Sequence, residues 1–217
     1  NIRQHRDFVL VGATATFSEQ MTTQLGHLNC KWVHCAERRW PLQRFTVKVP
    51  NRELYPAIVY TVRQLILRHQ TCLVFLPGKQ EIKEVLAQLV NADGVHPSQV
   101  SELHAELNED EKIKAMSAQA ILSTSIAETS ITLPELDHVL DSGLSRTTEM
   151  WEGHVVTWRT LPAPPSAIDQ RAGRAGRVKP GCATRFVPDD GEVLEESRLP
   201  IAIDEIQIVL AFQQQYT

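Results

Sequence analysis

Features that would indicate secretion, a membrane or a disulfide-stapled scaffold are scarce in this sequence. Its 217 residues include only four cysteines, and their spacing matches no disulfide framework, so reduced thiols inside a cell are expected. No apolar run approaches about 18 residues, and no signal-peptide pattern opens the chain. We therefore expect no membrane segment and an intracellular location, with the cytoplasm favoured and the nucleus still open.

A second absence concerns nucleotides. No segment has the G-x-x-x-x-G-K-[ST] pattern of a phosphate-binding loop, and the pair Gly78-Lys79 lacks its upstream glycine and the following Ser or Thr. The acidic stretch 204-DEIQ-207 belongs to an amphipathic pattern and follows no such loop. The chain begins at Asn1 rather than at Met, so we expect a fragment that cannot hold a nucleotide and its magnesium alone.

Metal ligands are also few. The stretch 27-HLNCKWVHC-35 brings together four possible zinc ligands: His27, Cys30, His34 and Cys35. Their spacing matches no standard zinc finger, and there is no distant second pair, so buried or surface thiols are favoured. We assign no metal site to the chain.

What the sequence does contain is an alternation of short apolar runs and amphipathic stretches. The runs predict strands at 8–13, 45–49, 72–76, 100–104, 119–124, 137–141 and 182–187. The stretches predict helices near 18–27, 53–69, 79–91, 108–117, 166–176 and 203–215. This pattern indicates an α/β fold, a doubly wound and mostly parallel sheet with helices on both faces, whose ligands gather at the carboxyl ends of the strands.

The segment 170-QRAGRAGR-177 sets three arginines on a frame of alanine and glycine, in a chain of net charge −4: Arg171, Arg174 and Arg177. Residues three and six apart share one stripe of a helix, so we expect the three side chains to point the same way. Ser166 would cap this helix, with Asp169 as its capping-box partner. The small residues would let a ligand approach the backbone, whereas a solvated basic surface, the alternative, fits the glycines poorly.

Five segments in chain order carry a family resemblance: 14-TAT-16, 72-CLVFLPGKQEI-82, 103-LHAELNEDEKIKAM-116, 121-ILSTSIAETSIT-132 and 170-QRAGRAGR-177. They resemble motif III, motif IV, the stretch after it, motif V and motif VI of superfamily 2 helicases. The similarity is closest to the DEAH/RHA group and to related viral RNA helicases. It implies a RecA-like fold, the second of the two RecA-like domains in such enzymes.

The resemblance implies that Gln170, Arg174 and Arg177 face the γ-phosphate of ATP, or of another NTP, held with Mg²⁺ mainly by a first RecA-like domain. Arg174 and Arg177 would act as arginine fingers, because a guanidinium stays charged and its planar fork matches phosphate oxygens. Arg171 matches a position whose role in the family is more structural.

Further nucleotide and RNA contacts are implied for motifs IV and V. Phe75 matches an aromatic that stacks on the base, with packing in the core as the favoured alternative. Two motif V residues match positions near the ribose, and three residues match positions that touch the backbone of the bound strand. The first set is Ser130 and Thr132, and the second is Gly78, Thr124 and Ser125. For the two hydroxyls of the second set, capping of the next helix together with Glu128 is the alternative.

The alternation of polar and large apolar residues over 146–160 predicts a β-hairpin that turns at Gly153. Its position resembles that of the hairpin at the duplex fork in this family. Trp151 and Trp158 could stack on bases, although packing of one tryptophan on the other across the two strands is the commoner arrangement.

The resemblance also divides the chain. Residues 1–17 would end the first RecA-like domain and contain Thr14 and Thr16, which would couple the two domains. Residues 18–44 would form a linker and the entry to the second RecA-like domain at 45–187. Residues 188–217 would begin a C-terminal accessory region.

Together these expectations describe the C-terminal motor half of an NTP-dependent RNA helicase, an NTP hydrolase that is active only when joined to a first RecA-like domain. Its partners would be that domain, single-stranded or duplex RNA and protein regulators. A catalytically inactive RecA-like binding or regulatory module is the alternative. Gln170, Arg174 and Arg177 favour the motor, since a scaffold has no need of three γ-phosphate contacts.

Overall fold

The structure is a computed structural model, and it describes residues 23, 31–33, 39–129, 133, 135–151 and 154–189. The chain divides into two compact units, Asn1–Ala36 and Glu37–Thr217, and the fold below belongs to the second. The strand expected at 8–13 and the helix expected at 203–215 lie outside the described residues. The domain boundaries expected at 17, 44 and 187 stay predictions.

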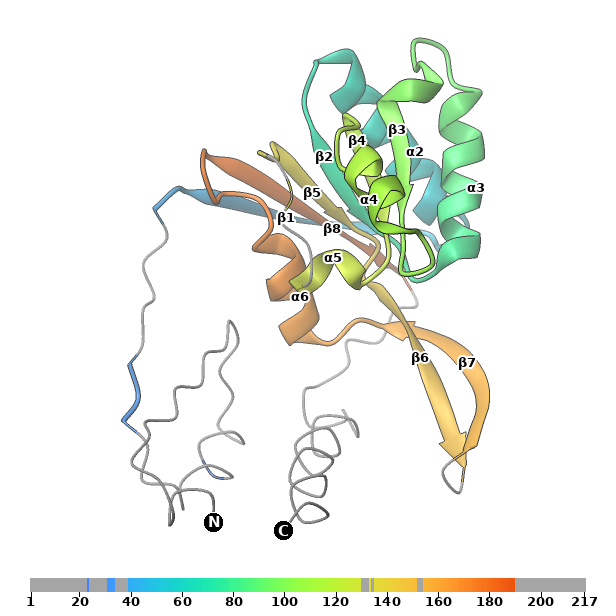
Figure 1. The fold of residues 1–217 in the computed structure, drawn as a ribbon, viewed down its shortest axis with the longest axis vertical. Helices are drawn as coiled ribbons and strands as arrows, with labels where there is room; N and C mark the ends of the chain where they lie inside the picture. Colours follow the sequence, from blue (N-terminus) through green and yellow to red (C-terminus); the bar gives the residue numbers. More distant parts are fainter. Residues whose placement is uncertain are drawn as a thin grey trace. The chain divides into compact units, whose positions relative to one another are not determined.

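Six parallel strands form one sheet in the order β1-β8-β5-β2-β4-β3 (Figure 1). Their bounds are Leu42–Val49 for β1, Cys72–Phe75 for β2, Val100–Leu103 for β3, Ala120–Ser123 for β4, His138–Asp141 for β5 and Gly181–Pro188 for β8. All six overlap the strands predicted from the apolar runs. The central strands β2 and β4 are buried at every position, as continuous apolar runs require.

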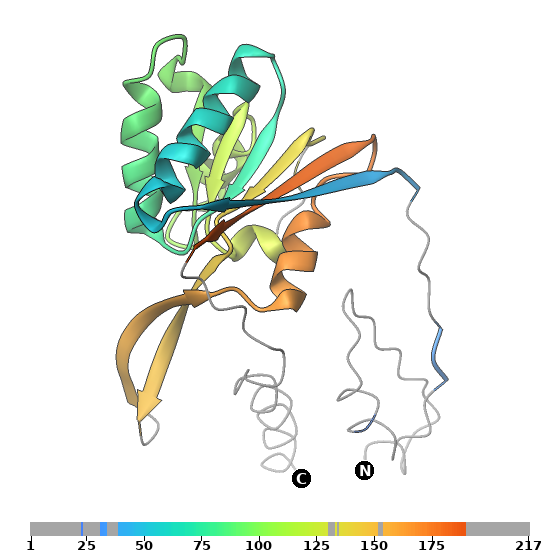
Figure 2. The ribbon, with the colours of Figure 1, turned by 180° about the vertical axis from the view of Figure 1, so that it is seen from behind.

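Helices cover both faces of this sheet. One face carries α2, Leu54–Leu67, and α3, Lys79–Val90; the other carries α4, Glu109–Ala115, α5, Ile126–Thr129, and α6, Pro165–Ala172 (Figure 2). Short 3-10 turns lie at Asn51–Glu53 and Pro97–Gln99. The doubly wound α/β fold is thus confirmed. Within the described ranges, no helix has the length and apolar character to cross a membrane.

The helices follow from residue spacing and capping. In α2 the buried residues recur at helical intervals and form one apolar stripe on the sheet: Leu54, Ile58, Val62, Leu65 and Ile66. Helix α4 begins with a capping box. The Asn108 side chain accepts a hydrogen bond from the Glu111 amide at 2.9 Å, and the Glu111 carboxylate accepts one from the Asn108 amide at 2.8 Å. Spacing and caps of this kind made these helices predictable.

A two-stranded hairpin extends away from the main sheet (Figure 1). Strand β6, Leu144–Trp151, pairs antiparallel with β7, His154–Pro162, and the register shifts between Glu149 and Met150. The hairpin was predicted, although the turn expected at Gly153 lies outside the described residues. Strand β6 begins three residues after β5 ends, so the hairpin starts at the carboxyl edge of the sheet.

Candidate functional site

Helix α6 is shorter than the arginine pattern predicts. It begins at Pro165, with Pro164 rather than Ser166 at the N-cap, and it ends at Ala172. Proline suits the first helical turn because its missing N–H would be unpaired there in any case. The capping box of Ser166 and Asp169 is therefore wrong. Residues 173–179, which we call the arginine turn, continue as turns and bends, so the three arginines do not share one helical stripe.

Arg171 is the best-buried arginine of the segment, with 2% of its surface exposed. Its guanidinium forms ion pairs with Glu128 at 2.7 Å and with Asp141 at 2.9 Å. It also donates to the Leu144 carbonyl at 3.0 Å and to the Ser145 hydroxyl at 2.6 Å. Burial lowers the pKa of Arg171, but the carboxylates of Asp141 and Glu128 outweigh it and raise the pKa above its ordinary value.

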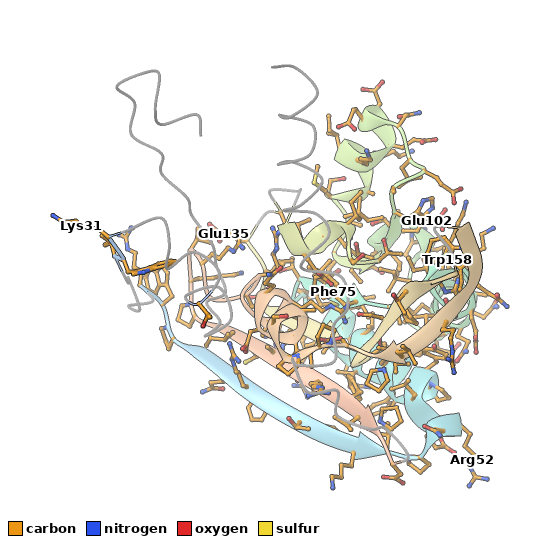
Figure 3. The ribbon with its side chains drawn as sticks, turned by 90° about the horizontal axis from the view of Figure 1, so that it is seen from below. Lys31, Arg52, Phe75, Glu102, Glu135 and Trp158 are labelled. Atoms are coloured by element: carbon orange, nitrogen blue, oxygen red, sulfur yellow. The ribbon has the colours of Figure 1, made fainter. Side chains whose placement is uncertain are left out.

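Phe75, labelled in Figure 3, lies in the core. Its ring is fully buried, and the Arg171 Cζ lies 5.3 Å from the ring centroid. A guanidinium at that distance over an aromatic face makes a cation–π contact. The prediction that Phe75 stacks on a nucleotide base does not fit this packing, because no part of the ring reaches the surface. The favoured alternative, a core residue, is what the structure has.

The small residues of the segment pack on the sheet rather than leaving space for a ligand. Ala172 and Ala175 are buried in the core of this face. Gly176 has a φ of +69°, a backbone conformation that glycine adopts without strain. A Cβ on Gly181 would come within 2.6 Å of the Gly176 nitrogen, so two segments of main chain meet there. The predicted function of the small residues, access for a ligand, is therefore wrong at these positions.

The two proposed arginine fingers differ in exposure. Arg174 is 6% exposed, and its Nε donates to the Glu128 carbonyl at 3.0 Å. Burial, and then the positive charge of Arg177, lower the pKa of Arg174 below its ordinary value, although arginine stays protonated in proteins. Arg177 is exposed, and its Nε donates a hydrogen bond to the Gly173 carbonyl at 3.0 Å. Gln170, near the end of α6, is partly buried.

The segment from Arg171 to Lys179 lies along strand β5. Arg171 pairs with Asp141, the last residue of β5, whereas Lys179 pairs at 2.7 Å with Asp137, which precedes the strand. The Asp137 carboxylate also accepts from the Thr71 amide at 2.8 Å and from its hydroxyl at 2.9 Å. The far end of the arginine turn is therefore at the amino edge of the sheet, away from the carboxyl ends of the strands where ligands were expected.

Three of the predicted RNA contacts do lie at the carboxyl edge. Gly78 follows β2 and is the N-cap of α3, while Thr124 and Ser125 follow the neighbouring strand β4. Ser125 is exposed and Thr124 is partly exposed. A capping box with Glu128 would need the carboxylate that Arg171 holds instead. The helix-capping alternative is weakened accordingly.

Several predicted site residues lie outside the described part of the chain. They are Thr14 and Thr16, Ser130 and Thr132, and the possible metal ligands His27, Cys30, His34 and Cys35. Their roles stay predictions. Among the described residues there is no cluster of three or more metal-ligating side chains.

The hairpin separates the two tryptophans. Trp158 is paired with Thr148 and Trp151 with His154, so the two are not directly opposite each other in the strand register. The side chain of Trp151 lies outside what the structure describes, so packing of one tryptophan on the other stays a prediction. Trp158 is 64% exposed on β7 (Figure 3).

Sequence reasoning missed the acidic partners of the basic segment, Glu128, Asp137 and Asp141. A signal was present, because Asp137 and Asp141 bracket the apolar run 138-HVL-140, where an unpaired buried charge would be costly. Each carboxylate needed a cation nearby. The arginines of motif VI and the nearby Lys179 were the obvious candidates.

The comparisons with known proteins agree with this geometry. Residues 57–179, more than half of the chain, match the family described as the helicase conserved C-terminal domain. The chain belongs to this family. The matched residues run from helix α2 to the arginine turn and include every described residue assigned above to nucleotide or RNA.

Its relatives are DEAH/RHA-type RNA helicases. The domain is 36% identical over 135 residues to the mouse ATP-dependent RNA helicase TDRD9, which covers 58% of this chain and 10% of that protein. It is 30% identical over 186 residues to the Arabidopsis thaliana pre-mRNA-splicing factor ATP-dependent RNA helicase DEAH10, covering 78% and 26%. The chain thus spans about a tenth to a quarter of the relatives it matches.

Solved structures give the same result. The crystal structure of the E. coli DExH-box NTPase HrpB matches with a TM-score of 0.66 and 25% identity, over 82% of this chain and 23% of that one. The helicase C-terminal domain described here therefore has the fold expected from its motifs.

Proposed function

We propose that this domain is the second motor domain of an ATP-dependent RNA helicase and that it completes an NTP site whose other half lies on a first RecA-like domain. The observation that carries the proposal is the exposure of Arg177 on the arginine turn. Its guanidinium is exposed on a turn whose neighbouring residues, Arg174 and Ala175, are buried. A charged side chain held on a fixed main chain is preorganised for an anion on a facing surface.

In this proposal Arg177 contacts the γ-phosphoryl group directly. Arg174 is the second cation of the site. Its Nε donates to the Glu128 carbonyl, and the positive charge of Arg177 is close enough to lower its pKa. As negative charge spreads over the phosphoryl oxygens in the transition state, these two cations stabilise it, and Gln170 supports the same site. ATP and Mg²⁺ are held mainly by the first domain.

The proposed RNA contacts lie at the carboxyl edge, away from the far end of the arginine turn. Short hydroxyls at Thr124 and Ser125 and the Gly78 main chain suit sugar and phosphate contacts, which position a strand without reading its bases. The domain would therefore bind RNA independently of sequence. A net charge of −4 is compatible with this role, since a phosphate track needs only local donors and positive charge.

The competing function is a catalytically inactive RecA-like module that binds RNA or protein regulators. Such a module has no use for an exposed Arg177 beside a second cation. The two functions therefore differ most in the effect that they predict for replacement of Arg177.

The experiment joins this chain to a first RecA-like domain and measures steady-state ATP hydrolysis with RNA present. Arg177→Ala should reduce turnover by about 10³-fold, the scale on which arginine fingers act. Arg177→Lys should recover little of it, because an ammonium lacks the bidentate fork. Arg52→Ala is the matched control, since the Arg52 side chain is 88% exposed and lies outside the proposed site. Turnover of the Arg177→Ala variant near that of the control would reject the finger role and favour the inactive module.

A further inference from the structure

The root of the hairpin is tied to helix α3 by one ion pair. Arg146, the third residue of β6, donates from Nη2 to the Glu81 carboxylate at 2.9 Å. Glu81 is the third residue of α3 and only 15% of its side chain is exposed, while 32% of the Arg146 side chain is exposed. A glutamate at this helical position often bonds back to the N-cap amide. Here one of its oxygens reaches another element instead.

Gly78 makes room for this pair. A Cβ at Gly78 would lie 2.6 Å from Arg146 Nη1 and 2.8 Å from Arg146 Cζ. It would also lie 2.8 Å from the second oxygen of Glu81. These separations are shorter than non-bonded atoms accept, so the guanidinium and the carboxylate rest directly on the Gly78 main chain. A side chain at Gly78 would therefore force the ends of the Arg146 and Glu81 side chains to shift.

The same root is held from the other face of the sheet. Arg171 donates to the Leu144 carbonyl and to the Ser145 hydroxyl, the two residues just before Arg146. Three consecutive residues at the start of β6 are thus fixed by motif VI on one side and by α3 on the other. The two strands beyond this root pair with each other, and a two-stranded hairpin alone is only marginally stable in water.

Tyr55 of α2 lies close to the pair. Burial raises the pKa of Tyr55 to about 12, and the charges of Glu81 and Glu84 add to this, while Arg146 opposes it. Arg146 therefore brings positive charge to the same place as these two carboxylates of α3. Exposed ion pairs contribute little because water screens them, but a carboxylate as covered as Glu81 loses more when its partner is removed.

We propose that the Arg146–Glu81 pair, seated on Gly78, is a positioning device that fixes the direction in which the β6–β7 hairpin leaves the sheet. The proposal deepens the function proposed above and rests on it for one consequence: the pair is required for duplex separation and not for ATP hydrolysis. Neither residue contacts the reacting groups, and both act through the hairpin.

The first test uses the present chain and needs no helicase activity. Hydrogen–deuterium exchange is measured by mass spectrometry over β6 and β7 for Arg146→Glu, Glu81→Arg and the double charge swap. Each single swap should speed exchange in these strands by about threefold or more, the scale of coupling between contacting residues, and the double swap should recover part of the protection. Gly78→Ala should act like a single swap, because its Cβ displaces the guanidinium.

The matched control is the ion pair between Lys112 and Glu109, both within helix α4, swapped in the same way; the Glu109 side chain is 84% exposed. Single swaps at Arg146 and Glu81 that change hairpin exchange no more than this control would overturn the proposal. So would single-swap effects that the double swap does not reverse, since these would come from the new charges alone.

The second test joins the chain to a first RecA-like domain and compares RNA duplex unwinding with RNA-stimulated ATP hydrolysis. Arg146→Glu should slow unwinding by about tenfold, a change of about 1.4 kcal/mol in the barrier, with ATP turnover within about twofold of the parent. Equal loss of both activities would reject the positioning role. If no RNA-stimulated hydrolysis is found in the parent, the proposed function fails, and the exchange test still decides whether the pair holds the hairpin.

Discussion

The guanidinium of Arg171 lies over the ring of Phe75, with 5.3 Å between its Cζ and the ring centroid. Phe75, which was expected to stack on a nucleotide base, and Arg171, which was expected to be structural, are therefore neighbours in one buried cluster. The cluster also contains Asp141 and Glu128, so a strand end, a short helix and motif VI share it. Arg171 of motif VI thus joins three elements of the domain.

Replacement of Arg171 by alanine should destabilise the domain strongly. The substitution leaves Asp141, which is 4% exposed, and Glu128 without their cation, and breaking a buried pair in this way costs about 3–5 kcal/mol. Urea unfolding followed by circular dichroism measures the loss. Arg44→Ala is the control, because its ion pair with Asp169 is about half exposed and should contribute no more than about 1 kcal/mol. Equal losses of stability in the two variants would show that the buried ion pairs of Arg171 contribute no more to folding than the exposed pair of Arg44.

The ion pair between Asp137 and Lys179 should make stability depend on acid pH. Burial alone would raise the pKa of Asp137, but hydrogen bonds from Lys179 and Thr71 outweigh it and hold the pKa below its ordinary value. A depressed folded-state pKa contributes stability above the unfolded value, about 3.9, and that contribution is lost as pH falls through the folded value. Asp137→Asn should therefore cost about 1 kcal/mol at pH 7.

The loss of folding stability caused by Asp137→Asn should become smaller as the pH is lowered below about 4, because the parent then also loses its charge at this position. Thermal melting of the parent and the variant across this pH range checks the expectation. A constant difference between the two melting temperatures, from pH 7 to the lowest pH at which the parent folds, would show that the charge of Asp137 is not the cause.

RNA binding by this chain alone should be weak and sensitive to salt, and the chain alone should not hydrolyse ATP above background. Only one side of the proposed groove is present, and contacts to phosphate release counterions, so affinity falls steeply as salt rises. Thr124→Ala and Ser125→Ala should each reduce binding of single-stranded RNA, measured by fluorescence anisotropy, by about threefold to tenfold. Unchanged affinity in the double substitution would remove motif V from the RNA site, and robust hydrolysis by the chain alone would contradict the two-domain proposal.

The sheet was predictable because each central strand is a short, continuous apolar run, a pattern that suits a buried strand better than a helix. Strands β2 and β4 are four residues each and fully buried, which leaves a continuous apolar signal. Helices α2 and α3 were predictable from spacing. Helix α5 was missed, since four residues, Ile126–Thr129, are too few to show a period.

The candidate site was only partly predictable. Motif order indicated the arginines and the loops after β2 and β4. It did not indicate that Arg171 and Arg174 are buried, because this depends on Asp141 and Glu128, which belong to other elements. The same holds for Gly78. Its lack of a side chain suggested a ligand, whereas the atoms that occupy the space belong to Arg146 and Glu81.

The two carboxylates that bracket β5 have a mechanical consequence. Asp137 and Asp141 are four residues apart, which is about 13 Å in a strand, and the segment from Arg171 to Lys179 is bonded to both through its two end residues. Arg174 and Arg177 lie between these two anchors, so a shift of the segment along the strand would stretch one ion pair or the other. If a phosphate binds Arg177 as proposed, a force on that side chain would therefore reach both ends of β5.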